Sequence, residues 1–158
     1  MTSHPLATTA SVSPVLHETS GAIAVLTLNS PASRNALSEE MIAALHAAID
    51  ASAADHAIRA IVIAANGTAF CAGHDLKQLT ARRSDADRGR SYFRHIMTSC
   101  AAMMQAIVHC PKPVIAAVNG VASAAGCQLV ATCDLAVASS QAKFATPGVD
   151  IGLFCSTP

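Results

Sequence analysis

Two segments of this chain share one order of residues. Each is an apolar run of β-branched and small residues that stops at an Asn-Gly pair, and small residues then lead into a helical pattern. The apolar runs are residues 58–65 and 114–118, and the helical patterns open at residues 71–75 and 123–128. Because Asn-Gly pairs end strands, each segment reads as strand, turn and helix. The repeat predicts an α/β fold of stacked units rather than a helical bundle.

The rest of the chain fits this arrangement. Residues 15–28 form two strand-like runs around Ser20-Gly21 and predict a hairpin, while residues 134–139 predict a third short strand. Ser38 is a suitable cap for a helix over residues 38–52, in which Met41, Ile42, Leu45 and Ile49 share one face. A second amphipathic helix has apolar residues at helical spacing. They are Phe93, Ile96, Met97, Cys100, Met103, Met104, Ile107 and Val108.

Composition indicates one domain with a real core, since 52% of the 158 residues are hydrophobic and 13% are charged. Residues 1–13 predict a flexible tail, and residues 14–158 the domain. Ten basic and ten acidic residues balance, which argues against nucleic-acid and membrane partners. No apolar run approaches the about 20 residues that span a bilayer. The six cysteines form no C-x-x-C pair and have no zinc-ligand spacing, so we expect buried free thiols in a reducing compartment. The tail lacks the arginine of an organelle transit peptide, so we expect a cytoplasmic location.

Charge is unevenly distributed. Residues 77–94 hold six of the ten basic residues. A solvated loop and an anion-facing rim both remain open as interpretations. The seven histidines have no metal-ligand spacing, so no metal site is predicted. The chain also lacks the nucleophile-elbow, zinc-protease, Walker A and dinucleotide-binding motifs.

The two small-residue turns suggest chemistry. The first N–H groups of a helix are unpaired and favour negative charge, and small residues let a ligand approach the backbone. Two such groups aimed at one point make an oxyanion hole, although two unrelated helix starts fit the same spacing. His74 lies in the first turn, where it is either structural, solvent-facing or catalytic.

Several ordered motifs resemble the crotonase family, the enoyl-CoA hydratases and isomerases. They are "SRNALS", "AFCAGHDLKQL" and "PKPVIAAVNGVASAAGCQLVATCDLAVASSQAKFATPGVDIGL". The likeness runs from Ile23 to the last residue and is greatest to the branch called enoyl-CoA hydratase domain-containing proteins. It implies a spiral of ββα turns that binds an acyl-CoA. The chain is expected to stop before the helical C-terminal region with which family members close the acyl pocket and build trimers or hexamers.

The resemblance also implies site residues. The thioester oxygen is held by the backbone N–H groups of His74 and Ala125. Coenzyme A enters as part of the substrate, so no separate cofactor is expected. The pantetheine and nucleotide path is lined by Ala36, Leu37, Asp75, Leu76 and Lys77, and Arg82 and Arg83 are possible phosphate contacts.

Two positions depart from the family pattern. Where hydratases carry two glutamates that handle water and the α-carbon proton, this chain has Gln128 and Gly148. An amide does not exchange protons near neutral pH, and glycine has no side chain. Ordinary hydratase activity is therefore not expected. The remaining hypotheses are isomerisation or thioester hydrolysis with another base, Asp150 or His74, and a non-catalytic acyl-CoA-binding or scaffold subunit.

Overall fold

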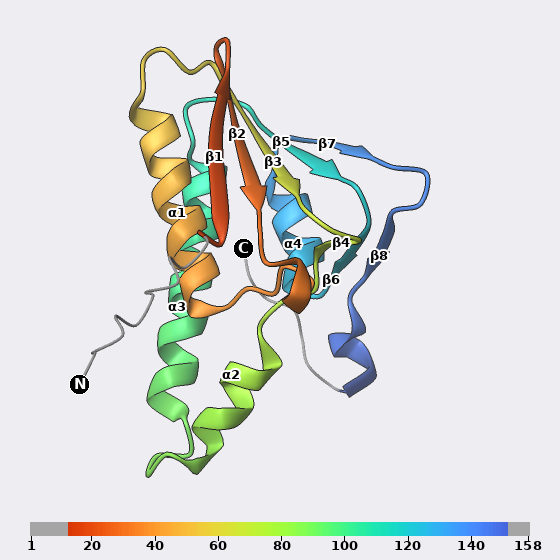
Figure 1. Ribbon diagram of the computed structural model, residues 1–158. Coiled ribbons are helices and arrows are strands. Elements are labelled where there is room, and N and C mark those ends of the chain that lie inside the picture. Colours follow the sequence, from red (N-terminus) through yellow and green to blue (C-terminus); the bar gives the residue numbers. More distant parts are fainter. Residues whose placement is uncertain (1–12, 152–158) are drawn as a thin grey trace, which may run out of the picture.

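The computed structural model describes residues 13–151 (Figure 1). The predicted tail, residues 1–13, lies outside the described residues except for Ser13. The strands are β1 (Val15–Ser20), β2 (Ile23–Leu28), β3 (Ala60–Ala65), β4 (Ala69–Cys71), β5 (Val114–Val118), β6 (Val121–Ser123), β7 (Leu135–Ala138) and β8 (Lys143–Ala145). The helices are α1 (Glu39–Ala54), α2 (Leu76–Ala81), α3 (Arg90–Val108) and α4 (Ala125–Thr132), with short 3-10 helices η1 (Pro31–Ser33), η2 (Arg82–Ser84) and η3 (Pro147–Ile151).

The strands form two sheets. The larger has the order β1-β2-β3-β5-β7, and the smaller has the order β4-β6-β8. Strands β1 and β2 are the predicted antiparallel hairpin, and all other pairs are parallel. Each coil of the chain therefore adds one strand to each sheet, as β3 then β4, β5 then β6, and β7 then β8. This is the predicted spiral of ββ units with helices between them.

The individual strands of the smaller sheet were not recognised from the residue pattern. These strands have three residues each, which is too short for an alternating pattern to be recognised. Phe70 in β4 nevertheless lies fully inside the core. Within the described residues, none of the helices combines the length and the apolar character needed to cross a bilayer.

Helix α1 forms as predicted. The Ser38 hydroxyl accepts a hydrogen bond from the Met41 N–H at 3.1 Å, and the four apolar residues of its predicted face are buried. At the other end, the Lys112 ammonium donates to the carbonyl oxygens of Ser52, at 2.7 Å, and Asp55. A cation at this end stabilises the negative end of the helix dipole.

Helix α3 packs against α1 and α4. Ile96, Cys100 and Ile107 are buried as predicted, and Met103 and Met104 fill the core. The prediction fails at Met97, which is 39% exposed, and at Val108, which is 54% exposed, while Phe93 is half-buried. Val108 is the last residue of the helix and therefore reaches beyond its packing partners.

Asparagines at strand ends, among them those of the two Asn-Gly pairs, join successive coils. Asn29, Asn66 and Asn119 follow β2, β3 and β5, which are neighbours in the larger sheet. The Asn66 amide donates to the Asn29 side-chain oxygen at 2.9 Å. The Asn119 amide donates to the carbonyl oxygens of Ala65 and Gly67 at 3.1 and 2.8 Å. The asparagines thus fix the ends of β2, β3 and β5. Strands β4 and β6, which lead into the two small-residue turns, follow β3 and β5.

Candidate active site

The two small-residue turns lie against each other. A Cβ placed on Gly73 would be 3.0 Å from both the Ala124 Cβ and the Ser123 carbonyl oxygen, and 3.3 Å from the Ala125 nitrogen. Gly73 also has φ of +89°, which favours glycine. The absence of a side chain therefore lets the first turn touch the start of α4. Two segments about 50 residues apart in the chain meet here backbone to backbone.

Hydrogen bonding orients the first turn. Leu37 and His74 form a parallel bridge, in which the Leu37 N–H donates to the Gly73 carbonyl at 2.8 Å and the Asp75 N–H donates to the Leu37 carbonyl at 3.3 Å. In such a bridge the central residue directs its own N–H to the opposite side. The His74 N–H therefore points away from Leu37.

Both N–H groups named from the resemblance are unpaired within residues 13–151. Neither the His74 N–H nor the Ala125 N–H donates a hydrogen bond to a described residue. Ala125 is the first residue of α4, whose opening N–H groups have no acceptor inside the helix. Two unpaired donors thus lie on the two turns that touch.

The second turn is strained. Ala124 has φ of 50° and ψ of −122°, a conformation that residues with a side chain rarely adopt. Its N–H donates to the Ala145 carbonyl at 2.8 Å, so β8 helps to hold the turn. Backbone strain of this kind costs about 1–3 kcal/mol and tends to occur at functional sites.

The His74 side chain is mostly buried. Its Nδ1 atom is inaccessible to solvent and has no hydrogen-bond partner among the described residues. Burial lowers the pKa of the imidazole below its usual 6.5, and an interaction with the Leu37 backbone offsets this in part. The ring is therefore neutral at pH 7 and retains one basic nitrogen.

The residues predicted to line the coenzyme A path occupy different settings. Ala36 and Leu37 are buried next to His74. The Asp75 carboxylate caps α2 and accepts hydrogen bonds from two backbone N–H groups at 2.8 and 3.3 Å. Leu76 is 72% exposed, and Lys77 is also exposed. The segment with Ala36 and Leu37 therefore lies next to the segment with Asp75. The side chains of Leu76 and Lys77 instead face solvent at the start of α2.

The positions of the missing acids lie on two elements. Gln128 is in the middle of α4, where its N–H donates to the Ala124 carbonyl at 3.1 Å. Gly148 and Asp150 lie in η3, which follows β8 directly. The Asp150 side chain is exposed and makes no hydrogen bond or ion pair with residues 13–151. Asp134, in contrast, accepts from the Val114 N–H at 2.8 Å and is structural.

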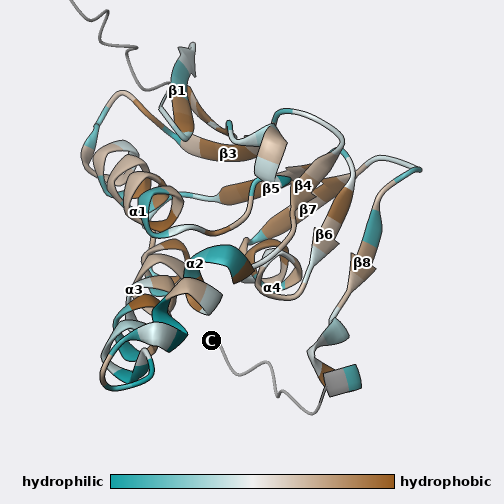
Figure 2. Cartoon of the chain, turned by 60° about the horizontal axis from the view of Figure 1, so that its bottom comes forward, coloured by the Kyte–Doolittle hydropathy of each residue, from teal (hydrophilic) through white to brown (hydrophobic). Residues whose placement is uncertain are grey.

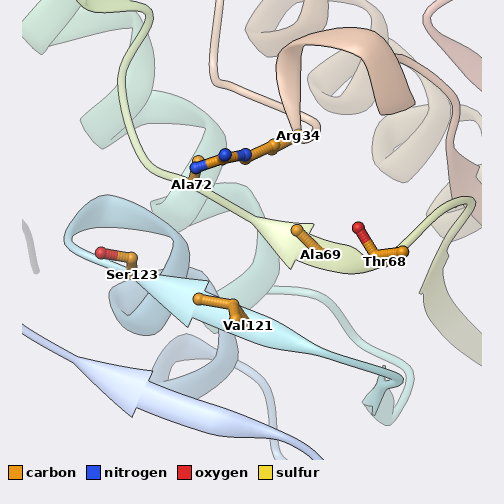
Figure 3. Close-up of a pocket in the computed structure, with 6 residues that line it drawn as sticks. All are labelled: Arg34, Thr68, Ala69, Ala72, Val121 and Ser123. Carbon is orange, nitrogen blue, oxygen red and sulfur yellow. The ribbon is translucent and has the colours of Figure 1, made fainter.

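An open cavity of about 420 Å³ lies beside the two turns (Figure 3). Ala72 and Ser123 line it, and each directly precedes one of the turns. None of the predicted site residues lines this cavity. The lining residues are Arg34, Thr68, Ala69, Ala72, Val121 and Ser123.

Arg34 is a functional candidate that the sequence reasoning missed. Its side chain extends across the cavity wall toward Ala72 (Figure 3) and forms no ion pair with a described residue. Arg34 and Asn35 both have positive φ, at 57° and 53°. The buried Asn35 amide fixes this turn, since it accepts from the Ser30 N–H at 2.8 Å and donates to the Ala69 carbonyl at 2.9 Å. The motif containing Arg34 was the available signal.

Two buried cysteines, Cys71 and Cys100, are protonated thiols at neutral pH. Burial raises the pKa of Cys71 to about 12 and that of Cys100 to about 11. Cys110 and Cys127 are only partly buried, and Cys155 lies outside the described residues. Within residues 13–151, no three His, Cys, Asp or Glu side chains gather as metal ligands would.

Comparison with known proteins agrees with this geometry. The chain is 52% identical over 131 residues to the enoyl-CoA hydratase domain-containing protein 3, mitochondrial, of Xenopus laevis, covering 83% of this chain and 43% of that protein. The crystal structure of the human enoyl-CoA hydratase domain-containing protein 3 matches with a TM-score of 0.83 and 46% identity, over 92% of this chain and 55% of that chain. An enoyl-CoA hydratase structure from Mycobacterium smegmatis matches with a TM-score of 0.82 and 50% identity, over the same shares. The chain thus spans about half the length of these relatives.

The predicted cytoplasmic location is wrong. The relatives from Xenopus laevis, Homo sapiens, Rattus norvegicus, Mus musculus and Danio rerio are all named as mitochondrial proteins. The prediction rested on unpaired cysteines and on a tail without arginine. Free thiols indicate a reducing compartment but do not tell one such compartment from another.

The match is not confined to the two turns. The family model described as "enoyl-CoA hydratase/isomerase" matches residues 18–157 of this chain. The solved structures confirm the crotonase-type fold expected from the motifs. This chain belongs to the enoyl-CoA hydratase/isomerase family.

Proposed function

We propose that this chain binds an acyl-CoA thioester and stabilises the enolate that forms from it. The thioester oxygen would accept hydrogen bonds from the N–H groups of His74 and Ala125. The observation that carries the proposal is that both N–H groups are unpaired while their turns touch, since a Gly73 Cβ would lie 3.3 Å from the Ala125 nitrogen. Donors fixed before the reaction stabilise developing negative charge without reorganisation.

The remaining predicted residues suit the coenzyme A moiety. Ala36 and Leu37 would line the pantetheine path next to His74, and Asp75 would hold the start of α2. The exposed side chains of Leu76 and Lys77 would offer an apolar contact and a cation. Arg34, which has no acidic partner among the described residues, adds a second cation near the turns. Coenzyme A phosphates are anionic, so both cations favour binding.

The reaction must manage without the two usual glutamates. With Gln128 and Gly148 in those places, we favour isomerisation or thioester hydrolysis over hydration. Both reactions still need a base. The neutral imidazole of His74 and the exposed carboxylate of Asp150 are the candidates, and the lowered pKa keeps His74 in its basic form at pH 7.

A second candidate function is a non-catalytic acyl-CoA-binding or scaffold subunit. The same two residues favour it, because neither Gln128 nor Gly148 transfers protons. The two N–H groups of the oxyanion hole would then bind the thioester oxygen without any reaction following.

Two measurements on the purified chain test both functions. Calorimetric titration with coenzyme A and acetyl-CoA reports binding. Steady-state assays with a panel of saturated and unsaturated acyl-CoA thioesters report turnover. Turnover of any member supports the enzyme, binding without turnover supports the subunit, and the absence of both contradicts the proposal.

A further inference from the structure

Helix α2 is poorly supported by its own residues. It has six residues, Leu76–Ala81, and none is buried. A helix this short is not stable in isolation. Figure 2 shows that α2 is hydrophilic along much of its length, and Leu79 is its one residue that packs against the hydrophobic core. A single apolar contact leaves the orientation of α2 to its polar contacts. Its position nevertheless matters, because it carries Leu76 and Lys77.

One side chain joins α2 to two other helices. The Gln78 Oε1 atom accepts hydrogen bonds from the Glu39 N–H at 3.0 Å and from the Tyr92 hydroxyl at 3.3 Å. The Gln78 Nε2 atom donates to the Glu40 carboxylate at 3.1 Å. Glu39 and Glu40 open α1, and Tyr92 is in the first turn of α3. Gln78 therefore connects α1, α2 and α3 through three hydrogen bonds.

Charges strengthen this junction. Hydrogen bonds from its own backbone, from Ser38 and from Gln78 lower the pKa of Glu40, so its carboxylate is ionised at neutral pH and is a strong acceptor. The Arg82 guanidinium lies 4.8 Å from the centroid of the Tyr92 ring. The contact between the His95 imidazole and the Glu39 carboxylate, at 3.5 Å, is exposed and contributes little. Through Tyr92, Gln78 thus also influences where Arg82 lies.

We infer that Gln78 is a positioning residue that holds α2, and with it Lys77 and Arg82, in the orientation that binds acyl-CoA. This inference rests on the proposed function. Gln78 does not act on the reacting atoms. It fixes the short helix on which the coenzyme A contacts are presented, so its loss weakens binding and leaves the oxyanion donors in place.

Three variants of the full chain test the inference. Gln78→Met keeps the length of the side chain and removes all three hydrogen bonds, whereas Tyr92→Phe removes one. Gln105→Met is the matched control, because Gln105 is also half-buried in a helix and its side chain makes no hydrogen bond with a described residue. We expect the Kd for coenzyme A to rise about five- to thirtyfold in Gln78→Met. The rise should be smaller in Tyr92→Phe and absent in the control.

A second readout separates positioning from general destabilisation. In Gln78→Met, amide hydrogen exchange should accelerate in residues 76–81 while the Tm stays within the range of the control. If any thioester is turned over, KM should rise while kcat changes less than twofold. Unchanged exchange in α2 overturns the inference, as does faster exchange with an unchanged Kd. If native protein does not bind coenzyme A, the proposed function fails, and the exchange data still report on whether Gln78 holds α2.

Discussion

Gly126 in α4 lies directly against the backbone of Cys71 in β4. A Cβ on Gly126 would come within 2.2 Å of the Cys71 carbonyl oxygen and 2.8 Å of its Cβ. The nearest atoms belong to the backbone, which cannot move aside as the end of a flexible side chain can. The contact joins the first turn of α4 to the strand that leads into His74, and it therefore keeps the two candidate N–H groups together.

Gly126→Ala should separate these elements or strain them. We expect a loss of about 3 kcal/mol in the free energy of unfolding, since overpacking typically costs about 1–3 kcal/mol and here the clash is with backbone. Urea unfolding measures it. Gly21→Ala is the control, because Gly21 has φ of +58° but no atom within 4 Å of an added Cβ. If Gly126→Ala lowers the free energy of unfolding no more than Gly21→Ala does, the contact between Gly126 and Cys71 has room for a methyl group.

Ala125→Pro tests the second donor. Proline has no N–H but is tolerated at the first position of a helix, which Ala125 occupies. If a thioester is turned over, the rate should fall about a hundredfold to a thousandfold, the usual loss for one oxyanion donor. Circular dichroism must show a native spectrum for the comparison to count. Unchanged kinetics in a folded variant would place the oxyanion hole elsewhere.

His74 should make stability depend on pH. Burial lowers its folded-state pKa below the 6.5 of the unfolded chain, so the unfolded state binds the proton more readily between these two values. The contribution of His74 to stability is therefore complete above about pH 6.5 and decreases as the pH falls toward the folded-state pKa.

The matched variants are His74→Gln and His56→Gln, because His56 is exposed. We expect the free energy of unfolding, measured in urea from pH 7.5 to 5, to depend less on pH in His74→Gln than in native protein. His56→Gln should retain the native slope. Equal slopes in all three proteins would mean that folding does not change the pKa of His74.

The 158-residue chain should self-associate. Leu135 and Val137 in β7 are 63% and 69% exposed, and Phe144 in β8 is 49% exposed. Apolar surface gathered on two adjacent strand edges favours association. Helix α3 contributes less, since most of its apolar face is buried. Sedimentation at micromolar concentration should show oligomers, and Val137→Lys should weaken them; a native monomer would contradict this.

Much of the fold could be predicted because long elements carry strong patterns. The hairpin, α1, α3 and the buried strands β3 and β5 all have the expected periodicity. Strands β4, β6 and β8 could not be predicted, since three residues contain too little alternation. The Asn-Gly pairs were recognised as strand ends, but the hydrogen bond from Asn66 to Asn29 depends on two coils being stacked, which local sequence does not encode.

The site was predictable in part for a similar reason. The motif placed His74 and Ala125 on two turns, and small residues suggested that a ligand could approach. That Gly73 touches Ala124 follows only from the pairing of β4 with β6. Arg34 was missed as a candidate because only the folded turn brings it beside Ala72 at the cavity. Gln78 was missed because its three partners belong to two other helices, α1 and α3, and local sequence does not show that these helices meet α2.

The final prediction concerns the acids that this chain lacks. Hydration of an enoyl thioester needs a base that activates water and an acid that protonates carbon, and each positioned group contributes about a hundredfold to ten-thousandfold. Gln128 lies in α4, whose first residue is Ala125, and Gly148 lies in η3. The amide of Gln128 does not transfer protons, and Gly148 has no side chain. We therefore expect negligible hydration of crotonyl-CoA by the native chain.

Restoring both acids should be required to recover hydration. Gln128→Glu and Gly148→Glu should each remain inactive, because one proton transfer stays uncatalysed, and only the double variant should gain activity. Spectrophotometric hydration assays on folded protein decide this, with Gln128→Met plus Gly148→Ala as the control for altered packing. Native turnover above about one per second, in the range of ordinary enzymes, would show that another group has taken over both transfers. His74→Gln and Asp150→Asn would then identify that group by the loss of activity, since His74 carries one of the two unpaired N–H donors and Asp150 is two residues beyond Gly148.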